Sequence, residues 1–279
     1  MIRAVLTSLT LALLSFTSPN APKAGISTFT SHAFKERVAL KENVHAVASK
    51  TAAVTFAEKQ MAFDDYALEV YNDASLKKAG LSFDVFQKAF VGYHNFRQQE
   101  LIDPANTILT VIDFSKPSRE KRLWIVDLQT KKLLYNTLVA HGRNTGQDKA
   151  TKFSNKPNSY MSSIGFYLTD KTYFGKHGLS LRLNGMDAKY NSNAMARAIV
   201  VHGADYVSEA FVKQYGRLGR SLGCPAVPEE VSKEVINLIK DNSCLYINGS
   251  DNSYTSNFLN TASAVEAFAM EAVNLPQQI

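Results

Sequence analysis

The chain has 279 residues, of which 45% are hydrophobic and 20% charged, and its formal net charge is +6. This is the composition of an ordinary globular protein, and it excludes a disordered, collagen-like or disulfide-scaffold chain. The two cysteines, Cys224 and Cys244, are too few for a dense disulfide framework or a four-cysteine zinc site.

The first residues have the pattern of a secretory signal peptide. Arg3 supplies a short positive segment, residues 4–16 are mostly apolar, and small residues with Pro19 follow. The alternative is a buried N-terminal helix, but the run stands at the extreme terminus and is too short to span a bilayer. Cleavage after Gly25 would lower the net charge from +6 to +4, because Arg3 and Lys23 leave without an acid. We therefore expect an exported protein of the periplasm or cell envelope, with no membrane span after cleavage.

A helical segment follows the predicted signal peptide. Residues 31–99 contain no proline and are rich in alanine, lysine, glutamate and valine, which favours helix. An imperfect helical stripe is formed by Phe34, Val38, Val44 and Val47. Further helices are predicted at 61–71 and 83–96, the second beginning after Ser82, a residue type typical of a helix N-cap.

After Pro104 the composition changes to short apolar or alternating runs bounded by Gly, Asn, Asp or Ser, which predict strands. These runs are residues 108–112, 123–126, 133–139, 164–168, 179–183, 198–201 and 244–247. Residues 123–139 resemble a hairpin around 127–132, and helices are predicted at 228–240 and 262–273. We predict an α+β protein, mainly β over 105–250 as a sheet sandwich or open barrel. Its divisions are a signal peptide (1–25), a helical region (26–104), this β-rich domain and a C-terminal helical extension (251–279).

Two segments carry a plausible nucleophile and base. A β-branched run ends in His202-Gly203, and a glycine-containing turn, residues 219–225, presents Cys224 just before Pro225. Gly223 allows a sharp turn, which lets the thiol stand clear and backbone N–H groups point at a bound oxygen. An imidazole can take the thiol proton and return it to a leaving amine. A small buried Cys224 is the plain alternative, and the turn and His202 argue against it.

These residues resemble the murein L,D-transpeptidases (YkuD-type catalytic domains), whose signature is a histidine followed by Ser/Thr-His-Gly-Cys. Here 18 residues separate His202 from Ser221, slightly more than in that signature, and the tetrad reads Ser221-Leu-Gly-Cys224. Leu222 in place of the second histidine resembles a branch that reads Arg-Ser-x-Gly-Cys-Pro-Ala. The resemblance covers about residues 108–247 and, more faintly, 79–93. Matching runs include 121–123, 139–146, 153–155, 162–167, 173–183 and 197–202.

The resemblance implies an acyl transfer on peptidoglycan stem peptides. Cys224 would attack the carbonyl of the third stem residue, typically a diamino acid, and release the terminal D-alanine. His202 would be the general base and then the acid, oriented by the carbonyl of Gly203. Backbone N–H groups near Gly223 and Cys224, with Ser221, would form the oxyanion hole. A second stem's amine would resolve the thioester into a 3→3 crosslink, whereas water would give L,D-carboxypeptidase activity.

Other polar residues have two readings each. His141 and His177 either line the cleft on the substrate side or hold a loop by hydrogen bonds, and the sequence leaves both open. Guanidinium groups can bind stem carboxylates bidentately, and the candidates are Arg182, Arg197, Arg217 and Arg220. For Arg197, at a strand start, a structural ion pair is the preferred reading. Three further histidines in helical segments are expected to be structural or exposed: His32, His45 and His94.

Cys244 lies in an apolar strand run and is expected to be part of the core. A disulfide between Cys224 and Cys244 stays open, since an oxidising compartment permits it and it would silence the nucleophile. The chain has no His-Glu-x-x-His motif and no phosphate-binding Gly-Lys-Ser/Thr loop, so we expect no metal and no cofactor.

The order of the catalytic residues along the chain distinguishes this family from other cysteine enzymes. A papain-like protease has its histidine after the cysteine, and a sortase-like enzyme has an arginine there, but neither residue follows Cys224. The spread of basic residues argues against nucleic-acid binding. A non-catalytic wall-binding protein on the same fold is the remaining alternative, motivated by Leu222 and opposed by the intact His202 and Cys224. We expect a monomer whose partners are peptidoglycan stem peptides.

Overall fold

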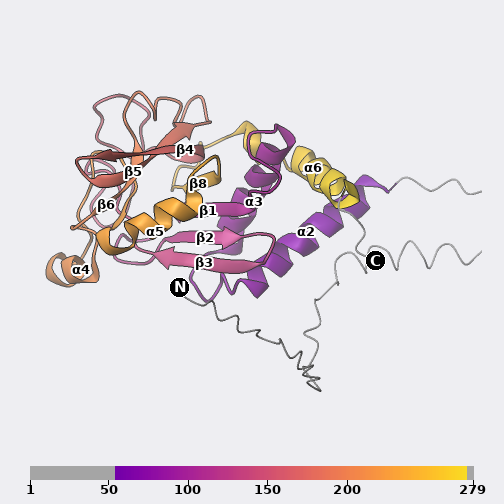
Figure 1. Cartoon of the computed structure of the whole chain (residues 1–279), viewed down its shortest axis with the longest axis horizontal. Coiled ribbons are helices and arrows are strands. Elements are labelled where there is room, and N and C mark those ends of the chain that lie inside the picture. Colours follow the sequence, from indigo (N-terminus) through magenta and orange to yellow (C-terminus); the bar gives the residue numbers. More distant parts are fainter. Residues whose placement is uncertain (1–53, 275–279) are drawn as a thin grey trace, which may run out of the picture. The chain divides into compact units, whose positions relative to one another are not determined.

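The computed structural model describes residues 54–274, and Figure 1 shows their arrangement. The predicted signal peptide and the stripe at 34–47 lie outside the described residues. The helices are α2 (Phe56–Asp73), α3 (Phe83–Gln98), α4 (Glu209–Tyr215), α5 (Glu229–Ile239), the short 3-10 helix η1 (Asn257–Leu259) and α6 (Thr261–Asn274). No helix in residues 54–274 is long and apolar enough to cross a membrane.

The first two helices begin at side-chain caps. Thr55 Oγ1 accepts a hydrogen bond from Glu58 N–H at 3.3 Å, and the Glu58 carboxylate accepts from Thr55 N–H at 2.9 Å, which completes a capping box. Ser82 Oγ accepts from Val85 N–H at 3.4 Å at the start of α3, where the sequence predicts an N-cap. These bonds satisfy backbone donors that have no partner within the helix.

Eight strands form one mixed sheet. They are β1 (Ile108–Asp113), β2 (Leu123–Asp127), β3 (Lys132–Thr137), β4 (Gly165–Gly175), β5 (Gly178–Gly185), β6 (Val200–Ala204), β7 (Ala226–Pro228) and β8 (Cys244–Asn248). Their order is β3-β2-β1-β8-β4-β5-β6-β7, with β1–β8 and β6–β7 parallel and the other pairs antiparallel. An isolated bridge joins Ala140, after β3, to Ala226 on β7, the last strand of the order. The sheet is therefore nearly closed, like a barrel.

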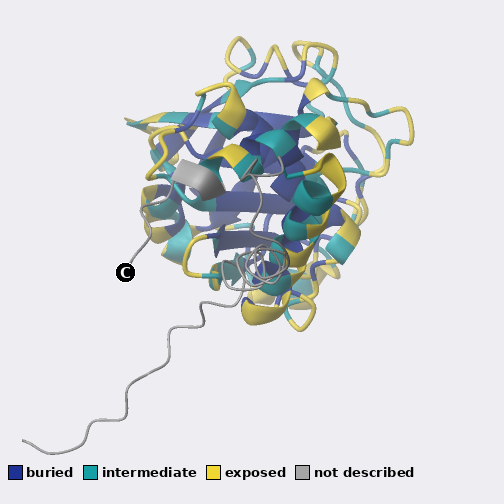
Figure 2. Ribbon diagram, turned by 90° about the vertical axis from the view of Figure 1, so that its right-hand side faces the viewer, coloured by how far each residue is buried: buried dark blue, intermediate teal, exposed yellow. Residues whose placement is uncertain are grey.

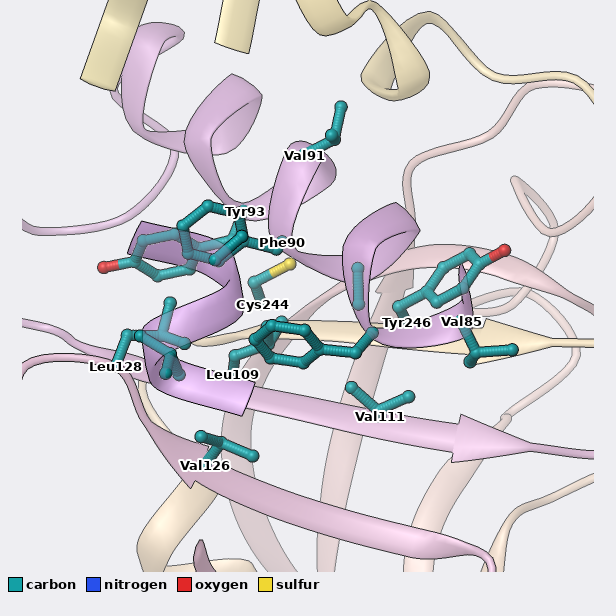
Figure 3. Close-up of a cluster of buried hydrophobic side chains, with 14 of the residues drawn as sticks. Val85, Phe90, Val91, Tyr93, Leu109, Val111, Val126, Leu128, Cys244 and Tyr246 are labelled. Carbon is teal, nitrogen blue, oxygen red and sulfur yellow. The ribbon is translucent and has the colours of Figure 1, made fainter. Parts of the chain in front are cut away.

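Alternating side chains divide the core between the two faces of the sheet. One face packs under α2, α3 and α6 and includes Leu109, Trp124 and Cys244. The opposite face packs around α5 and includes Ile112 and Ile125. Figure 2 shows the strands in the interior as mostly buried, and Figure 3 shows the cluster beneath α3. The helices α2, α3 and α6 thus share one hydrophobic cluster with the sheet.

The structure confirms the predicted α+β class with N-terminal and C-terminal helices. The predicted helices at 61–71, 83–96, 228–240 and 262–273 are present, and the predicted strands match seven of the eight in the sheet. The sequence analysis did not predict α4 or β7. Both are short, with seven and three residues, so neither offers a sustained hydrophobic period. The domain boundaries predicted from sequence stay predictions.

Candidate active site

The turn before β7 holds Cys224 in a fixed backbone arrangement. Ser221 Oγ accepts a hydrogen bond from Gly223 N–H at 3.0 Å and donates to the Cys224 carbonyl at 2.6 Å. Gly223 has φ +128°, and a Cβ there would lie 2.9 Å from the Met161 carbonyl oxygen. Only glycine fits this position without strain, as the sharp turn predicted from sequence requires.

Strand pairing brings His202 beside this turn. His202 lies on β6, opposite Ser180 of β5 and Ala226 of β7. Cys224 precedes Ala226 by two residues, and neighbouring strands lie about 4.8 Å apart. The Cys224 thiol donates to the Ala198 carbonyl at 3.7 Å, and the contacts of the described residues include no hydrogen bond between the thiol and His202. The proposed nucleophile and base thus lie on neighbouring segments, and the thiol is hydrogen-bonded to a backbone carbonyl rather than to the imidazole.

The ring of His202 is oriented by its own strand. Its Nδ1 lies 2.8 Å from the Gly203 carbonyl oxygen, which only accepts, so Nδ1 carries the proton and Nε2 is left with a free lone pair. Gly203 also lets α5 pack close, because a Cβ there would meet Ser232 Oγ at 2.8 Å. The carbonyl of Gly203 therefore occupies the place that the sequence analysis gave it.

Burial keeps both groups uncharged at rest. Burial raises the pKa of the Cys224 thiol, although backbone N–H groups of Val200 and Cys224 and the nearby Arg197 oppose this rise. Burial also lowers the pKa of His202, against the opposing hydrogen bond to Gly203. The resting arrangement is a neutral thiol beside a neutral imidazole, so proton transfer would accompany attack rather than precede it.

A second imidazole lies against His202. The rings of His177 and His202 are stacked, with centroids 4.4 Å apart and an interplanar angle of 25°. His177 is exposed and belongs to the tip between β4 and β5. The structure therefore places His177 against His202, whereas its contact with substrate stays a prediction.

His141 lies in the interior instead. It is fully buried, with Nδ1 2.8 Å from Arg122 Nη2, and burial lowers its pKa to about 4. Arg122, also fully buried, donates to the Val139 carbonyl as well. Arg220 donates to the carbonyls of Arg143 and Gly146 at 3.0 and 3.1 Å. These contacts favour the loop-holding reading of His141, and they engage Arg220 in the same loop.

Ser162 is a site residue to which the sequence analysis gave no role. It is buried, and its Oγ accepts from Gly142 N–H at 3.0 Å and donates to the Gly223 carbonyl at 3.1 Å. It thus ties the 142 loop to the turn that carries Cys224. Ser162 lies in the run 162–167, which is part of the sequence resemblance, and this was the feature of the sequence that could have indicated a role for it.

The other three candidate arginines make different kinds of contact. Arg197 donates to the carbonyls of Ser154 and Met161 and to serine hydroxyls. The ion pairs among residues 54–274 do not include Arg197, so the structural ion pair preferred from the sequence is replaced by hydrogen bonds to uncharged oxygens. Arg182 lies over the Tyr173 ring at 4.5 Å, and Arg217 donates to the Leu218 carbonyl.

The two cysteines have separate environments. Both are free thiols, and Cys244 is fully buried in the cluster beneath α3 (Figure 3), as expected for a core residue. Cys224 packs at the edge of the α5 cluster. Within the part of the chain that the structure describes, no group of three or more His, Cys, Asp or Glu side chains is arranged to hold a metal ion.

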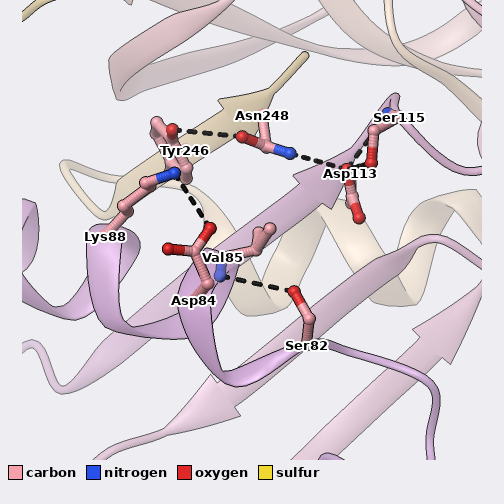
Figure 4. Close-up of polar contacts among 8 residues, drawn as sticks. All are labelled: Ser82, Asp84, Val85, Lys88, Asp113, Ser115, Tyr246 and Asn248. Atoms are coloured by element: carbon pink, nitrogen blue, oxygen red, sulfur yellow. Dashed lines mark hydrogen bonds and ion pairs between the residues drawn. The ribbon is translucent and has the colours of Figure 1, made fainter. Parts of the chain in front are cut away.

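A cavity of about 580 Å³ lies elsewhere, at the first turn of α3 and the ends of β1 and β8. Figure 4 shows its polar groups, including the Asp84–Lys88 ion pair at 2.9 Å and Asp113, which accepts from Asn248 at 2.8 Å. Neither Cys224 nor His202 lines this cavity, so the acyl-transfer chemistry is not assigned to it.

Comparison with known proteins identifies the domain. A profile of the family described as the L,D-transpeptidase catalytic domain (YkuD_2) matches residues 77–248. No curated protein sequence matches the chain.

Three solved structures illustrate the likeness. An L,D-transpeptidase from Mycobacterium smegmatis is 11% identical, with 51% of this chain and 59% of that chain covered and a TM-score of 0.33. The helical cell shape determining protein Pgp2 from Campylobacter jejuni is 10% identical over 66% and 64%, with a TM-score of 0.36. An L,D-transpeptidase from Mycobacterium tuberculosis is 13% identical over 51% and 57%, with a TM-score of 0.31. The chain spans less than two thirds of the length of each.

The profile match covers more than half of the chain and includes β1 to β8, His202 and Cys224. The chain therefore belongs to the L,D-transpeptidase catalytic domain family.

Proposed function

We propose that this chain is an exported cysteine acyltransferase that acts on peptidoglycan stem peptides. The observation that carries the proposal is the pairing of β6 with β7, which sets His202 beside the turn holding Cys224. The free lone pair on His202 Nε2 supports a base role, since Nδ1 is held by the Gly203 carbonyl.

In the first half-reaction, the Cys224 sulfur attacks the carbonyl carbon of the third stem residue while its proton passes to His202 Nε2. The tetrahedral intermediate collapses, the bond to the terminal D-alanine breaks, and the leaving amine takes the proton from His202. The product is a thioester on Cys224. An acceptor amine then attacks the thioester carbonyl carbon and gives a proton to His202. The carbon–sulfur bond breaks as the new amide forms, and His202 returns the proton to the sulfur.

The oxyanion hole is assigned to backbone N–H groups at Gly223 and Cys224 together with Ser221. The Cys224 N–H opposes the rise in the pKa of its own thiol, so it lies next to the attacking sulfur. The Gly223 N–H and the Ser221 hydroxyl are engaged within the turn at rest, so binding of substrate has to exchange these partners.

The substrate side and the location belong to the same proposal. His177 and Arg220 are proposed to contact the stem peptide, and the oxygens held by Arg220 mark the 143–146 loop as one wall. We propose that residues 1–25 direct export to the periplasm or cell envelope, that 26–104 and 251–279 flank the catalytic domain at 105–250, and that the protein acts as a monomer.

Trapping with a carbapenem tests the nucleophile. Reduced protein should gain one covalent adduct by intact-mass spectrometry, and Cys224→Ala should gain none. Cys244→Ala is the matched control, because Cys244 is buried on the other face of the sheet and should leave the adduct intact.

A digest of purified stem tetrapeptide with product analysis tests the reaction and its acceptor. A crosslinked dimer indicates a stem amine, an exchanged terminus indicates a free D-amino acid, and a tripeptide indicates water. Protein that forms no adduct, and neither cleaves nor exchanges the tetrapeptide, would favour a non-catalytic wall-binding protein and defeat the proposal.

A further inference from the structure

The hairpin formed by β4 and β5 continues past the residues that pair with β8 and β6, and its tip is exposed. Phe174 at this tip is 85% exposed, and residues 174–178 are all exposed. An exposed side chain at a hairpin tip can adopt many conformations, so a defined contact made by one of them is informative. The His177 ring makes such a contact, because it stacks on the ring of His202.

The stack complements the single hydrogen bond that holds His202. The bond from Nδ1 to the Gly203 carbonyl fixes one atom of the ring, but it permits some rotation of the ring about that contact. A second ring packed on the face, with centroids 4.4 Å apart, fixes the ring plane as well. Strand register supports this contact, because Ser180, three residues after His177, pairs directly with His202.

Two residues of the same tip add to the effect of burial on the pKa of His202. The groups that act electrostatically on the His202 ring are His177 and Lys176, both from this hairpin, and both disfavour its protonation. On the thiol, Arg197 and Lys176 act in the favourable direction. From α5, Glu229 packs against Gly203 through its backbone and Ser232 through its hydroxyl, and neither is among the groups acting on the ring.

We propose that His177 is a positioning residue, whose stacked ring holds the His202 imidazole in the plane that directs Nε2 toward Cys224. Burial lowers the pKa of His202, and the positive Lys176 of the same tip adds to this effect. This inference rests on the proposed roles of Cys224 and His202 and adds a residue from a strand hairpin that lies outside the motif around the nucleophile.

Two variants separate stacking from charge. His177→Phe keeps an aromatic ring on His202 and removes the imidazole, whereas His177→Ala removes both. Phe174→Ala is the matched control, because it removes an exposed ring from the same tip and leaves the His177–His202 stack in place.

The first readout is titration of His202 by NMR in the full chain, with its imidazole signal assigned by its absence from His202→Gln. We expect the pKa of His202 to rise in Lys176→Gln, because a positive neighbour is lost. We expect the Phe174→Ala titration to match that of the parent protein.

The second readout is the rate of Cys224 alkylation by iodoacetamide at pH 7, with Cys224→Ala giving the background. His177→Ala should lower the rate about tenfold, since a misplaced base assists less, and His177→Phe should restore most of it. Both readouts work without a substrate. A protein that fails to process tetrapeptide but shows these changes would lose the proposed function and keep the positioning role. An alkylation rate equal to that of the parent protein in both His177 variants would overturn the positioning role.

Discussion

His94 gives a prediction that links one buried ring to the pH dependence of folding. It lies on α3, 4% exposed, among the rings of Phe63 (centroids 5.5 Å), Phe90 (4.6 Å) and Phe268 (5.4 Å). Within residues 54–274, neither of its ring nitrogens has a hydrogen-bond partner. Burial, with a smaller effect of the positive Arg97, lowers the pKa of His94 to about 3.

The sign of the effect follows from where the proton binds. Below about pH 6.5 the unfolded chain protonates His94, whereas the folded protein leaves it neutral until about pH 3. The contribution of His94 to the free energy of unfolding is therefore fully present above about pH 6.5, and it is lost as the pH falls. At about 1.4 kcal/mol per pH unit, the contribution from His94 between pH 7 and pH 5 is about 2 kcal/mol.

Replacement by a side chain that does not titrate should remove this contribution. We expect His94→Phe and His94→Leu to lose about 2 kcal/mol less than the parent protein between pH 7 and pH 5. Urea unfolding followed by circular dichroism at both pH values measures the difference. The other titrating groups cancel in this difference, because the parent protein and both variants share them. Two variants guard against a packing fault in either. Equal losses in all three proteins would show that folded His94 is already protonated or solvated, and would refute the reasoning.

Three further predictions concern packing and chemistry. Gly92→Ala should destabilise the protein by about 2 kcal/mol or more, visible as a lower melting temperature, because the new Cβ would lie 1.9 Å from Cε1 of the fully buried Phe166; an unchanged melting temperature would contradict this close approach. Ser162→Ala should slow carbapenem acylation about tenfold or more, because the buried Gly142 N–H and Gly223 carbonyl lose their shared partner, and a rate equal to that of the parent would separate Ser162 from the turn. In the pH profile of kcat/KM for the tetrapeptide, the midpoint of the acidic limb should lie below pH 6.5, because His202 must be neutral to act as base and its pKa is lowered. A midpoint above pH 6.5 would exclude His202 as that base.

The sequence predicted those parts of the fold that have a sustained hydrophobic period. In β1, β2 and β8, alternate residues belong to opposite faces, and each run is long enough for the pattern to be seen. The sequence could not predict β7, because three residues define no period and its place is set by pairing with β6 and by the bridge to Ala140.

At the site, the sequence indicated Cys224, His202 and Gly203 because all three lie in short motifs. It could not separate His141 from His177, since each is a histidine before a glycine in the β-rich region. Tertiary structure distinguishes them: His141 is enclosed beside Arg122, whereas His177 is carried by a hairpin to the face of His202. Ser162 was missed for a similar reason, because a serine that joins two backbone groups from distant loops has no local pattern.

Leu222 shows why a motif comparison and a structure weigh the same departure differently. The sequence signature has a histidine at this position, and its loss motivates the alternative of a non-catalytic protein. Leu222 is 54% exposed and can neither titrate nor form a side-chain hydrogen bond, so this position adds no imidazole to the site. His177 is distant in sequence, yet the β4–β5 hairpin brings its imidazole into contact with His202. The sequence motif has one imidazole fewer than the family signature, whereas in the folded chain two imidazoles, those of His177 and His202, are stacked on each other. The substitution at 222 therefore weakens the case for catalysis less than the motif alone suggests.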